Sequence, residues 1–302
     1  MALELKLDFY PASNPSRTGV LVLPGGGYEF ISMDNEGIAL ARWLNDHQFD
    51  AWVLSYTTAG PSHPPPIFPA PQREALEAVR QIRASGRVDK LGIWGFSAGG
   101  HLAAVTATDP SVDLDFAILA YPVISMAAGT THEGSRRNLI GDGCGAGSDA
   151  ENAMCAEKRV DQNTPPTFLF HTANDDVVPV QNTLGFSVAM AKYKRPFELL
   201  ILPDGPHGIG LALGDVRLDW TGELDRWLKV SILNTILIMS RSILRKVHAL
   251  IFSTVSDDSD TILVYGTYLF PVLLSCSSNL APKNSYGLGM ATRPACSGVT
   301  TK

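Results

Sequence analysis

Short, continuous apolar runs alternate with helical patterns along most of this 302-residue chain. The runs predict buried strands at residues 19–24, 51–58, 90–96, 115–122, 167–172 and 197–203. Helical periodicity falls between or after them, at residues 38–44, 75–82, 101–108, 184–193 and 216–228. A strand that is apolar on both faces must be covered on both faces. The alternation therefore predicts an α/β fold, a mainly parallel sheet with helices on both sides.

The composition bears on the class of protein and on its partners. Hydrophobic residues make up 45% and charged residues 18% of the chain, as in a globular protein with a sizeable core. The net charge is −6 and the sequence has no basic stripe, so nucleic acid is not an expected partner. The start, MALELKLDFY, has no apolar core of signal-peptide length. This predicts a cytoplasmic protein, or a secreted one if the natural N-terminus is missing.

The cysteines do not form a metal-binding or redox pattern. The chain has four, Cys144, Cys155, Cys276 and Cys296. None belongs to a C-x-x-C pair, and none lies beside a histidine at metal-ligand spacing. We therefore expect free thiols in a reducing compartment and no bound metal.

Two segments depart from the alternation of predicted strands and helices. Residues 125–164 contain GDGCGAGSDAENA and little periodicity. We expect them to form an insertion between two strands, either a lid or specificity loop or a disordered surface loop. The predicted catalytic domain spans residues 1–229, and residues 230–302 are expected to form an atypical, poorly ordered tail. Within that tail, residues 261–282 have too short an apolar part to favour a membrane span.

The stretch GFSAGGHLAA places Ser97 between a predicted strand and a predicted helix. A G-x-S-x-G pattern indicates a nucleophile only in that strand–turn–helix setting. The flanking Gly95, Gly99 and Gly100 permit the strained turn that exposes the hydroxyl, and a helix N-terminus favours developing negative charge. We predict that Ser97 is a nucleophile. The alternative is a small residue in a tight turn.

A serine nucleophile needs a base, because its hydroxyl reacts poorly at neutral pH. Of the seven histidines, His207 lies in LPDGPHGIG, directly after the last predicted strand and at the same sheet edge as Ser97. His101 lies one helical turn along the helix and is assigned to packing or capping. His171 ends a buried strand; it is assigned mainly a structural role, and orienting the acid loop is the alternative. His207 is therefore the predicted base.

The orienting acid is expected after the strand TFLFHT, because the triad order in such sheets is serine, acid, histidine. Asp175 and Asp176 compete for this role. Adjacent side chains point apart, so only one of them can hold His207 in the required tautomer. The other carboxylate and Asn174 are expected to shape the turn. A purely structural turn is the alternative for both.

An oxyanion hole is expected in the loop LPGGGYEF, which follows the first clear strand. Glycines let the backbone approach a ligand closely, and their N–H groups can point at a developing oxyanion. Gly26 and Gly27 are the predicted donors, together with the N–H group of Ala98. The alternative is a flexible turn.

With these residues, the chain resembles the α/β-hydrolase superfamily. It is most similar to acetylxylan esterase-like, xylanase-associated esterases and lipases (the BD-FAE type). The matching blocks are LVLPGGGYEF, DNEGIALARWL, GFSAGGHLA, SRRNLIG, PPTFLFHTANDDVVPVQN and LPDGPHGIGLA, and the similarity covers residues 3–228. The family motif D-x-V-V-P implies that the acid is Asp175. The glycine-rich insertion and the tail lie outside the family pattern.

The resemblance implies a serine esterase that hydrolyses short acyl esters, mainly acetyl esters of carbohydrates, through a Ser97–His207–Asp175 triad and an acyl-enzyme. It implies no metal and no organic cofactor, and a small-molecule or oligosaccharide ester as substrate. The alternatives are an arylformamidase-like amidase, a catalytically silent binding protein of the same fold and a tail-anchored membrane esterase. Peptidase activity is disfavoured, because no propeller or other gating domain precedes the sheet. Neither the residues nor the resemblance predicts the oligomeric state.

Overall fold

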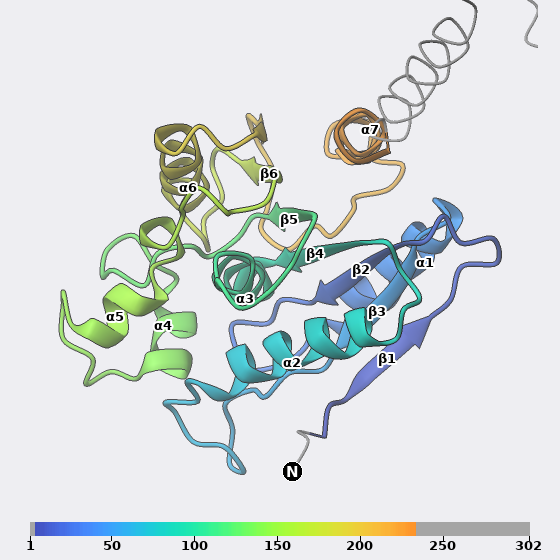
Figure 1. Cartoon of the computed structure of the whole chain (residues 1–302). Helices are drawn as coiled ribbons and strands as arrows, with labels where there is room; N and C mark the ends of the chain where they lie inside the picture. The colour runs from blue at the N-terminus through green and yellow to red at the C-terminus, as the bar shows by residue number, and fades with distance from the viewer. Residues whose placement is uncertain (1–3, 234–302) are drawn as a thin grey trace, which may run out of the picture. The chain divides into compact units, whose positions relative to one another are not determined.

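The computed structural model describes residues 4–233, which all belong to one compact unit (Figure 1). Its centre is a seven-stranded sheet in the order β1-β3-β2-β4-β5-β6-β7. The strands are β1 Leu7–Tyr10, β2 Thr18–Leu23, β3 Asp50–Leu54, β4 Lys90–Phe96, β5 Phe116–Ala120, β6 Thr167–Thr172 and β7 Phe197–Leu202. Only β1 pairs antiparallel; the pairs from β3 to β7 are all parallel. The predicted mainly parallel α/β sheet is confirmed.

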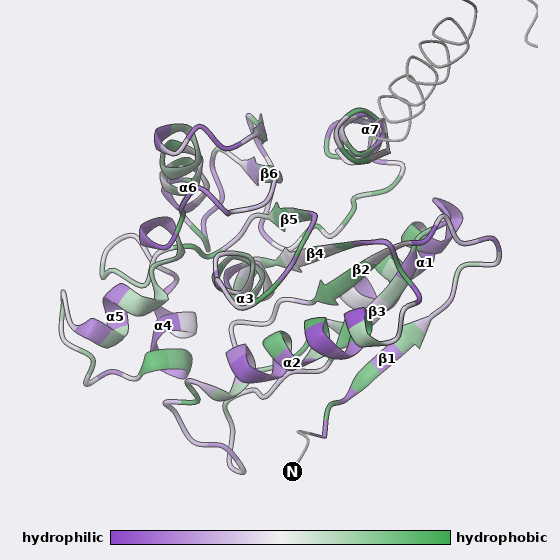
Figure 2. Ribbon diagram, in the orientation of Figure 1, coloured by the Kyte–Doolittle hydropathy of each residue, from purple (hydrophilic) through white to green (hydrophobic). Residues whose placement is uncertain are grey.

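The helices cover both faces of this sheet. They are α1 Ala39–Asp46, α2 Ala70–Ala84, α3 Ser97–Ala107, α4 Glu133–Ile140, α5 Asp149–Met154, α6 Gln181–Lys192 and α7 Thr221–Trp227. One hydrophobic cluster includes residues of α2, α3 and α6, and the other includes residues of α1 and α7. Strand β4 serves both, because Ile93 belongs to the first cluster and its neighbour Trp94 to the second. Figure 2 shows the result: β2 is mainly hydrophobic, whereas α2 alternates between hydrophobic and hydrophilic residues.

The largest differences between the predicted and the observed strands concern β1 and β3. Strand β1 was not predicted, because its four residues are only partly buried and form no continuous apolar run. It is an edge strand, and its Phe9 ring stacks on Trp52 at a centroid distance of 4.8 Å. The strand predicted at residues 51–58 ends at Leu54, since the chain leaves the sheet to form the loop before α2.

The insertion at residues 125–164 is folded and contains α4 and α5. Their sequences, EGSRRNLI and DAENAM, contain few apolar residues and show no clear periodicity, which is why these helices were not predicted. A buried ion pair holds them, with Arg136 Nη2 3.2 Å from Glu151 Oε2. Arg136 also donates to the carbonyl oxygen of Met126 at 3.0 Å. Its Nη2 also donates to the carbonyl oxygen of Cys144, so the buried guanidinium group ties the glycine-rich part of the insertion to the helices.

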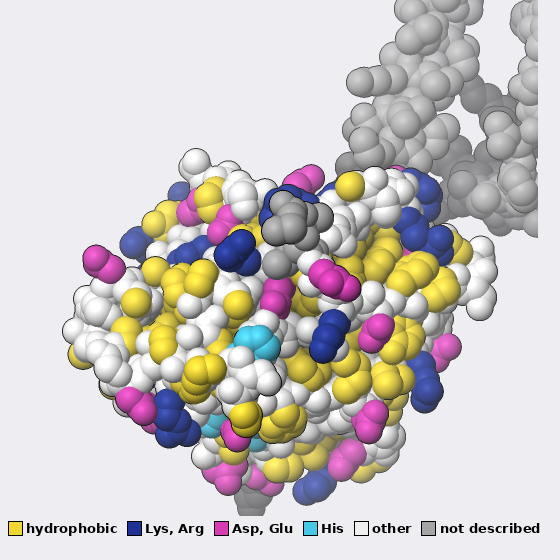
Figure 3. All heavy atoms as spheres, turned by 90° about the horizontal axis from the view of Figure 1, so that it is seen from below, with side chains coloured by type: hydrophobic (Ala, Val, Ile, Leu, Met, Phe, Trp, Pro, Cys, Tyr) yellow, Lys and Arg dark blue, Asp and Glu magenta, His cyan; other side chains and the backbone are white. Residues whose placement is uncertain are grey.

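The remaining predictions concern the thiols, the surface and the tail. Cys144 and Cys155 are free, whereas Cys276, Cys296 and the tail beyond residue 233 lie outside the described residues. On the face shown in Figure 3, basic and acidic side chains are scattered among hydrophobic ones. None of the helices within residues 4–233 is long and apolar enough to cross a membrane.

Candidate active site

Three predicted site residues meet at the carboxyl edge of the sheet. Ser97 follows β4 directly, Asp175 follows β6 and His207 follows β7. His207 Nε2 lies 2.9 Å from Ser97 Oγ, and His207 Nδ1 lies 2.7 Å from Asp175 Oδ2. A carboxylate can only accept, so Nδ1 carries the hydrogen and Nε2 is left to accept the serine proton. The structure thus brings together a hydroxyl, an imidazole and a carboxylate in one hydrogen-bonded chain.

Ser97 has a backbone conformation that side chains rarely adopt. Its φ is +52°, and it is the first residue of α3, directly after the end of β4. The turn is tight: a Cβ atom on Gly95 would lie 2.1 Å from the Gly99 carbonyl oxygen, and one on Gly99 would lie 2.1 Å from the Leu23 carbonyl oxygen. Both positions therefore require glycine. Strain of this kind costs on the order of 1–3 kcal/mol and is typical of functional sites.

The structure distinguishes the two competing aspartates. The side chain of Asp175 is 1% exposed, and its Oδ1 accepts hydrogen bonds of 2.9 Å from the N–H groups of Val177 and Val178. Asp176 is exposed and lines a different cavity beside Arg217. Only Asp175 contacts His207, as the resemblance implied.

Asp175 is held in its ionised form. Burial alone would raise its pKa, but hydrogen bonds from His171, His207 and the N–H group of Val178 outweigh this and hold the pKa well below its ordinary value. A carboxylate that is ionised at neutral pH can stabilise an imidazolium at the position of His207.

His171 contacts the acid loop, although the sequence assigned it mainly a structural role. Its ring is fully buried, with Nδ1 2.6 Å from Thr183 Oγ1 and Nε2 2.9 Å from the carbonyl oxygen of Val178. A carbonyl oxygen only accepts, so Nε2 carries the hydrogen. That nitrogen also lies 3.4 Å from Asp175 Oδ2. His171 therefore orients the acid as well as completing the core.

Asn174 was expected to shape the turn, and it does more. Its side-chain oxygen accepts from the N–H group of Gly205 at 3.0 Å, and its Nδ2 donates to Asp204 at 2.5 Å. These bonds tie the loop that carries the acid to the loop that carries His207.

The glycine loop lies beside Ser97. Gly26 and Gly27 have φ values of +127° and +64°, and both line the same cavity as the serine. Among the described residues, no acceptor binds the N–H group of either glycine. Ala98 is fully buried and does not line the cavity, but it is the second residue of α3, where backbone N–H groups have no acceptor within the helix.

This cavity has a volume of about 260 Å³. Its lining residues are Gly26, Gly27, Glu29, Phe30, Ser32, Glu36, Ser97, His132, Val177, His207 and Gly208. Sequence reasoning missed three titratable members, Glu29, Glu36 and His132. His132 comes from the insertion and caps α4 by accepting from the N–H group of Ser135. Burial and the nearby His207 lower its pKa, which favours a neutral ring in the cavity.

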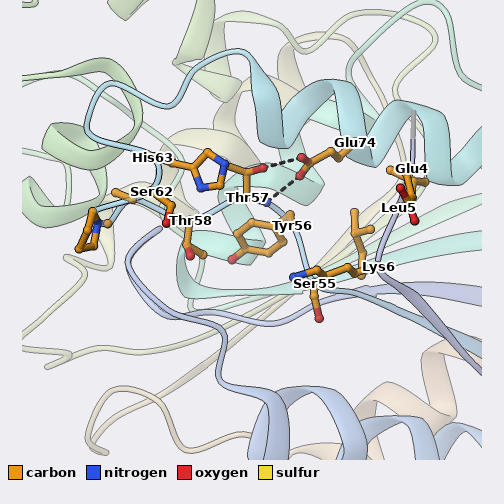
Figure 4. A pocket seen from close by; sticks show the side chains of 14 residues that line it. Glu4, Leu5, Lys6, Ser55, Tyr56, Thr57, Thr58, Ser62, His63 and Glu74 are labelled. Carbon is orange, nitrogen blue, oxygen red and sulfur yellow. Dashed lines mark hydrogen bonds between the residues drawn. The ribbon is translucent and has the colours of Figure 1, made fainter. Parts of the chain in front are cut away.

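A larger cavity of about 520 Å³ lies outside this site (Figure 4). Its lining comes from residues 4–6 and 54–63 and from Glu74 of α2. The Glu74 carboxylate accepts from the N–H group and the hydroxyl of Thr57, at 2.6 and 2.5 Å. Both oxygens of that carboxylate already accept hydrogen bonds, and Ser97 and His207 line the smaller cavity. Within residues 4–233, no group of three acidic, histidine or cysteine side chains is arranged to hold a metal ion.

A family model and two known proteins match large parts of the chain. A family model described as the prolyl oligopeptidase family matches residues 71–234, more than half of the chain. Endo-1,4-beta-xylanase B of Butyrivibrio fibrisolvens is 35% identical over 224 residues, which cover 68% of this chain and 34% of that protein. Acetylxylan esterase of Xylanibacter ruminicola is 31% identical over 226 residues, covering 72% and 46% respectively. The chain spans less than half the length of these two relatives.

Solved structures share the fold. An acetyl ester-xyloside bifunctional hydrolase from Caldicellulosiruptor lactoaceticus superimposes with a TM-score of 0.67 at 34% identity, over 75% of this chain and 88% of that one. A sugar hydrolase from Lactococcus lactis gives a TM-score of 0.61 at 26% identity, over 78% and 94%.

Proposed function

The chain belongs to the prolyl oligopeptidase family of α/β-hydrolases, and on this premise we propose that it is a serine esterase for short acyl esters, above all acetyl esters of carbohydrates. The observation that carries the proposal is the hydrogen-bonded chain from Ser97 through His207 to Asp175 beside a glycine-lined cavity. The relatives named acetylxylan esterase and acetyl ester-xyloside hydrolase support the class of substrate.

In the proposed acylation step, Ser97 Oγ attacks the ester carbonyl carbon and His207 Nε2 takes the hydroxyl proton. The carbonyl oxygen becomes an oxyanion. The N–H groups of Gly26, Gly27 and Ala98 are the proposed donors to it. The intermediate collapses when the bond to the alcohol oxygen breaks, and His207 gives that oxygen its proton. An alcohol leaves and the acyl group stays on the serine.

The second half of the reaction repeats the first with water. His207 removes a proton from a water molecule, whose oxygen attacks the acyl carbon, and the same proton returns to Ser97 Oγ as the acid departs. Asp175 stabilises the imidazolium in both halves and keeps the ring in the required tautomer. Its buried position and its two backbone N–H donors suit this role.

The lining of the cavity supports a small acyl group and a polar alcohol. A volume of about 260 Å³ lies just below the common range of about 300–1,000 Å³ for small-molecule sites. Glu29, Ser32 and His132 offer polar groups that suit hydroxyls of a sugar, while Phe30 and Val177 add apolar surface. We propose that the insertion acts as a specificity segment, since it contributes His132.

The test is hydrolysis of p-nitrophenyl acetate, p-nitrophenyl butyrate and acetylated xylo-oligosaccharide by the purified chain, with Ser97→Ala beside it. We expect acetate release by the wild type and a loss on the order of 10⁶ in kcat for the variant. Preference for acetyl over butyryl would match the small cavity.

Parallel assays on an N-formyl aryl amide and a prolyl p-nitroanilide test amidase and peptidase activity. A folded wild type that reacts faster with either amide would overturn the esterase assignment. A folded wild type that hydrolyses none of these substrates would favour a binding protein of the same fold.

A further inference from the structure

Glu36 is a buried carboxylate that the proposed mechanism does not use. It lies in the π-helical turn Met33–Ile38, just before α1, and its residue is 3% exposed. Burial raises the pKa of this carboxyl, and hydrogen bonds from Tyr121 and the N–H group of Gly25 oppose that rise. A buried charge is costly unless it is fully hydrogen-bonded. The partners of Glu36 therefore indicate what it does.

One oxygen of Glu36 holds the glycine loop. Its Oε2 accepts from the N–H group of Gly25 at 2.7 Å. Gly25 is packed between this acid and the serine, since a Cβ atom at Gly25 would lie 2.7 Å from Glu36 Oε2 and 3.0 Å from Ser97 Cβ. The next two residues are Gly26 and Gly27, the proposed oxyanion donors. Any shift of Gly25 is passed directly to them along the chain.

The other oxygen of Glu36 reaches the loop of the base. Its Oε1 accepts from the hydroxyl of Tyr121 at 2.8 Å, and that hydroxyl accepts from the N–H group of Gly210 at 2.8 Å. Gly210 follows His207 by three residues in the same loop. The ring of Tyr121 packs edge-on to the ring of His207 at a centroid distance of 5.0 Å. Tyr121 thus supports the base through both its hydroxyl and its ring.

We propose that Glu36 is a positioning residue. It holds the proposed oxyanion donors Gly26 and Gly27 and the loop of His207 in their positions around Ser97. This inference rests on the proposed esterase function. Both carboxylate oxygens accept hydrogen bonds, one from Gly25 in the glycine loop and one from Tyr121, which in turn binds Gly210 in the His207 loop. The amide of glutamine has one acceptor oxygen and an NH2 group that only donates, so either the Gly25 N–H group or the Tyr121 hydroxyl loses its acceptor at this place. The isosteric Glu36→Gln variant therefore breaks the link without changing the size of the side chain.

The experiment compares the full chain with Glu36→Gln on p-nitrophenyl acetate. We expect kcat to fall about 10- to 100-fold with KM changed less than about threefold, because small misplacements of reacting groups cost rates of that order. The affinity for phenylboronic acid, which forms a tetrahedral adduct on the serine, should weaken by a similar factor. Tyr121→Phe should reduce kcat too, and the double variant should lose less than the product of the two single losses.

Asp50→Asn is the matched control for loss of a buried carboxylate. Asp50 is fully buried at the amino end of β3, away from the site, where it accepts from the N–H group of Ala12 at 2.9 Å and pairs with Arg87 at 2.7 Å. We expect this variant to lower the Tm while kcat stays within about twofold of the wild type, because only the amino edge of the sheet is disturbed.

The outcomes separate this inference from the function on which it rests. An active wild type with Glu36→Gln unchanged in both kcat and boronic acid affinity would overturn the positioning role and leave the esterase function standing. So would a loss of activity that only follows the fraction of unfolded Glu36→Gln protein. A wild type that neither hydrolyses the ester nor is labelled by a fluorophosphonate would overturn both.

Discussion

His101 is fully buried in α3 and joins three parts of the site. Its Nδ1 lies 2.8 Å from the hydroxyl of Tyr28, next to the glycine loop, and its Nε2 lies 2.7 Å from the carbonyl oxygen of Met154 in the insertion. A carbonyl oxygen only accepts, so Nε2 carries the hydrogen and Nδ1 accepts from Tyr28. The folded chain therefore needs a neutral ring, and burial lowers the pKa of His101 from 6.5 to about 4.

This difference predicts how the stability depends on pH. Between pH 6.5 and about 4 the unfolded chain binds a proton at His101 and the folded chain does not, so the free energy of unfolding falls as the pH falls. At about 1.4 kcal/mol per pKa unit, the loss approaches about 3 kcal/mol at pH 4. That is a large part of a typical total of about 5–15 kcal/mol.

Urea unfolding of the full chain, followed by tryptophan fluorescence at pH 7, 6, 5 and 4.5, measures this loss. The comparison is His101→Gln, whose amide can donate to Met154 and accept from Tyr28 but does not titrate. The wild type should lose about 2–3 kcal/mol more than the variant over this range. The lowered pKa of His132 acts in the same direction in both proteins and cancels.

Asp175 does not interfere with that comparison. Its folded-state pKa lies below the unfolded value of 3.8, so its contribution is present above that value and is lost only as the pH falls further. Parallel pH curves for the wild type and His101→Gln would refute the reasoning, because they would mean that His101 is protonated equally in both states.

Two further predictions test Asp175 and the tight turn between β4 and α3. Asp175→Asn should lower kcat by about 10⁴, as loss of the orienting acid does in a comparable triad, whereas the exposed Asp176→Asn should stay within about threefold; equal effects in the ester assay would contradict the assignment. Gly99→Ala should destabilise the chain by about 3 kcal/mol or more, the upper end for overpacking, because the new methyl group would meet the carbonyl oxygen of Leu23 at 2.1 Å. Gly222→Ala in α7 has open space and should be neutral or stabilising by Tm.

The sequence predicted those parts of the fold that depend on local patterns. The strands at residues 90–96 and 167–172 are continuous apolar runs, and their bounds agree with β4 and β6. Strand β1 was missed because four half-exposed residues carry too little signal. Helices α4 and α5 were missed because their sequences, EGSRRNLI and DAENAM, contain few apolar residues and so carry no helical pattern.

The candidate site also has parts that local sequence patterns predict and parts that they do not. Ser97 and His207 were predicted from the sequence alone, because each lies in its own local pattern at the end of a strand. The choice between Asp175 and Asp176 needed the family resemblance, since two adjacent carboxylates look alike in sequence. In the structure, two backbone N–H groups of the following turn hold Asp175 toward His207. That direction depends on backbone geometry, which the residue types alone do not specify.

Glu36 shows the difference between what the local sequence determines and what the tertiary structure decides. By itself, the sequence determined the class of sheet, the order of the proposed catalytic groups and the edge at which they meet, because apolar periodicity and turn glycines act over a few residues. Only the tertiary structure decided that Glu36 meets Gly25, 11 residues before it, and Tyr121, 85 residues after it. Such a contact depends on which loops the order of the strands brings together at the edge of the sheet, and no local sequence pattern encodes that order.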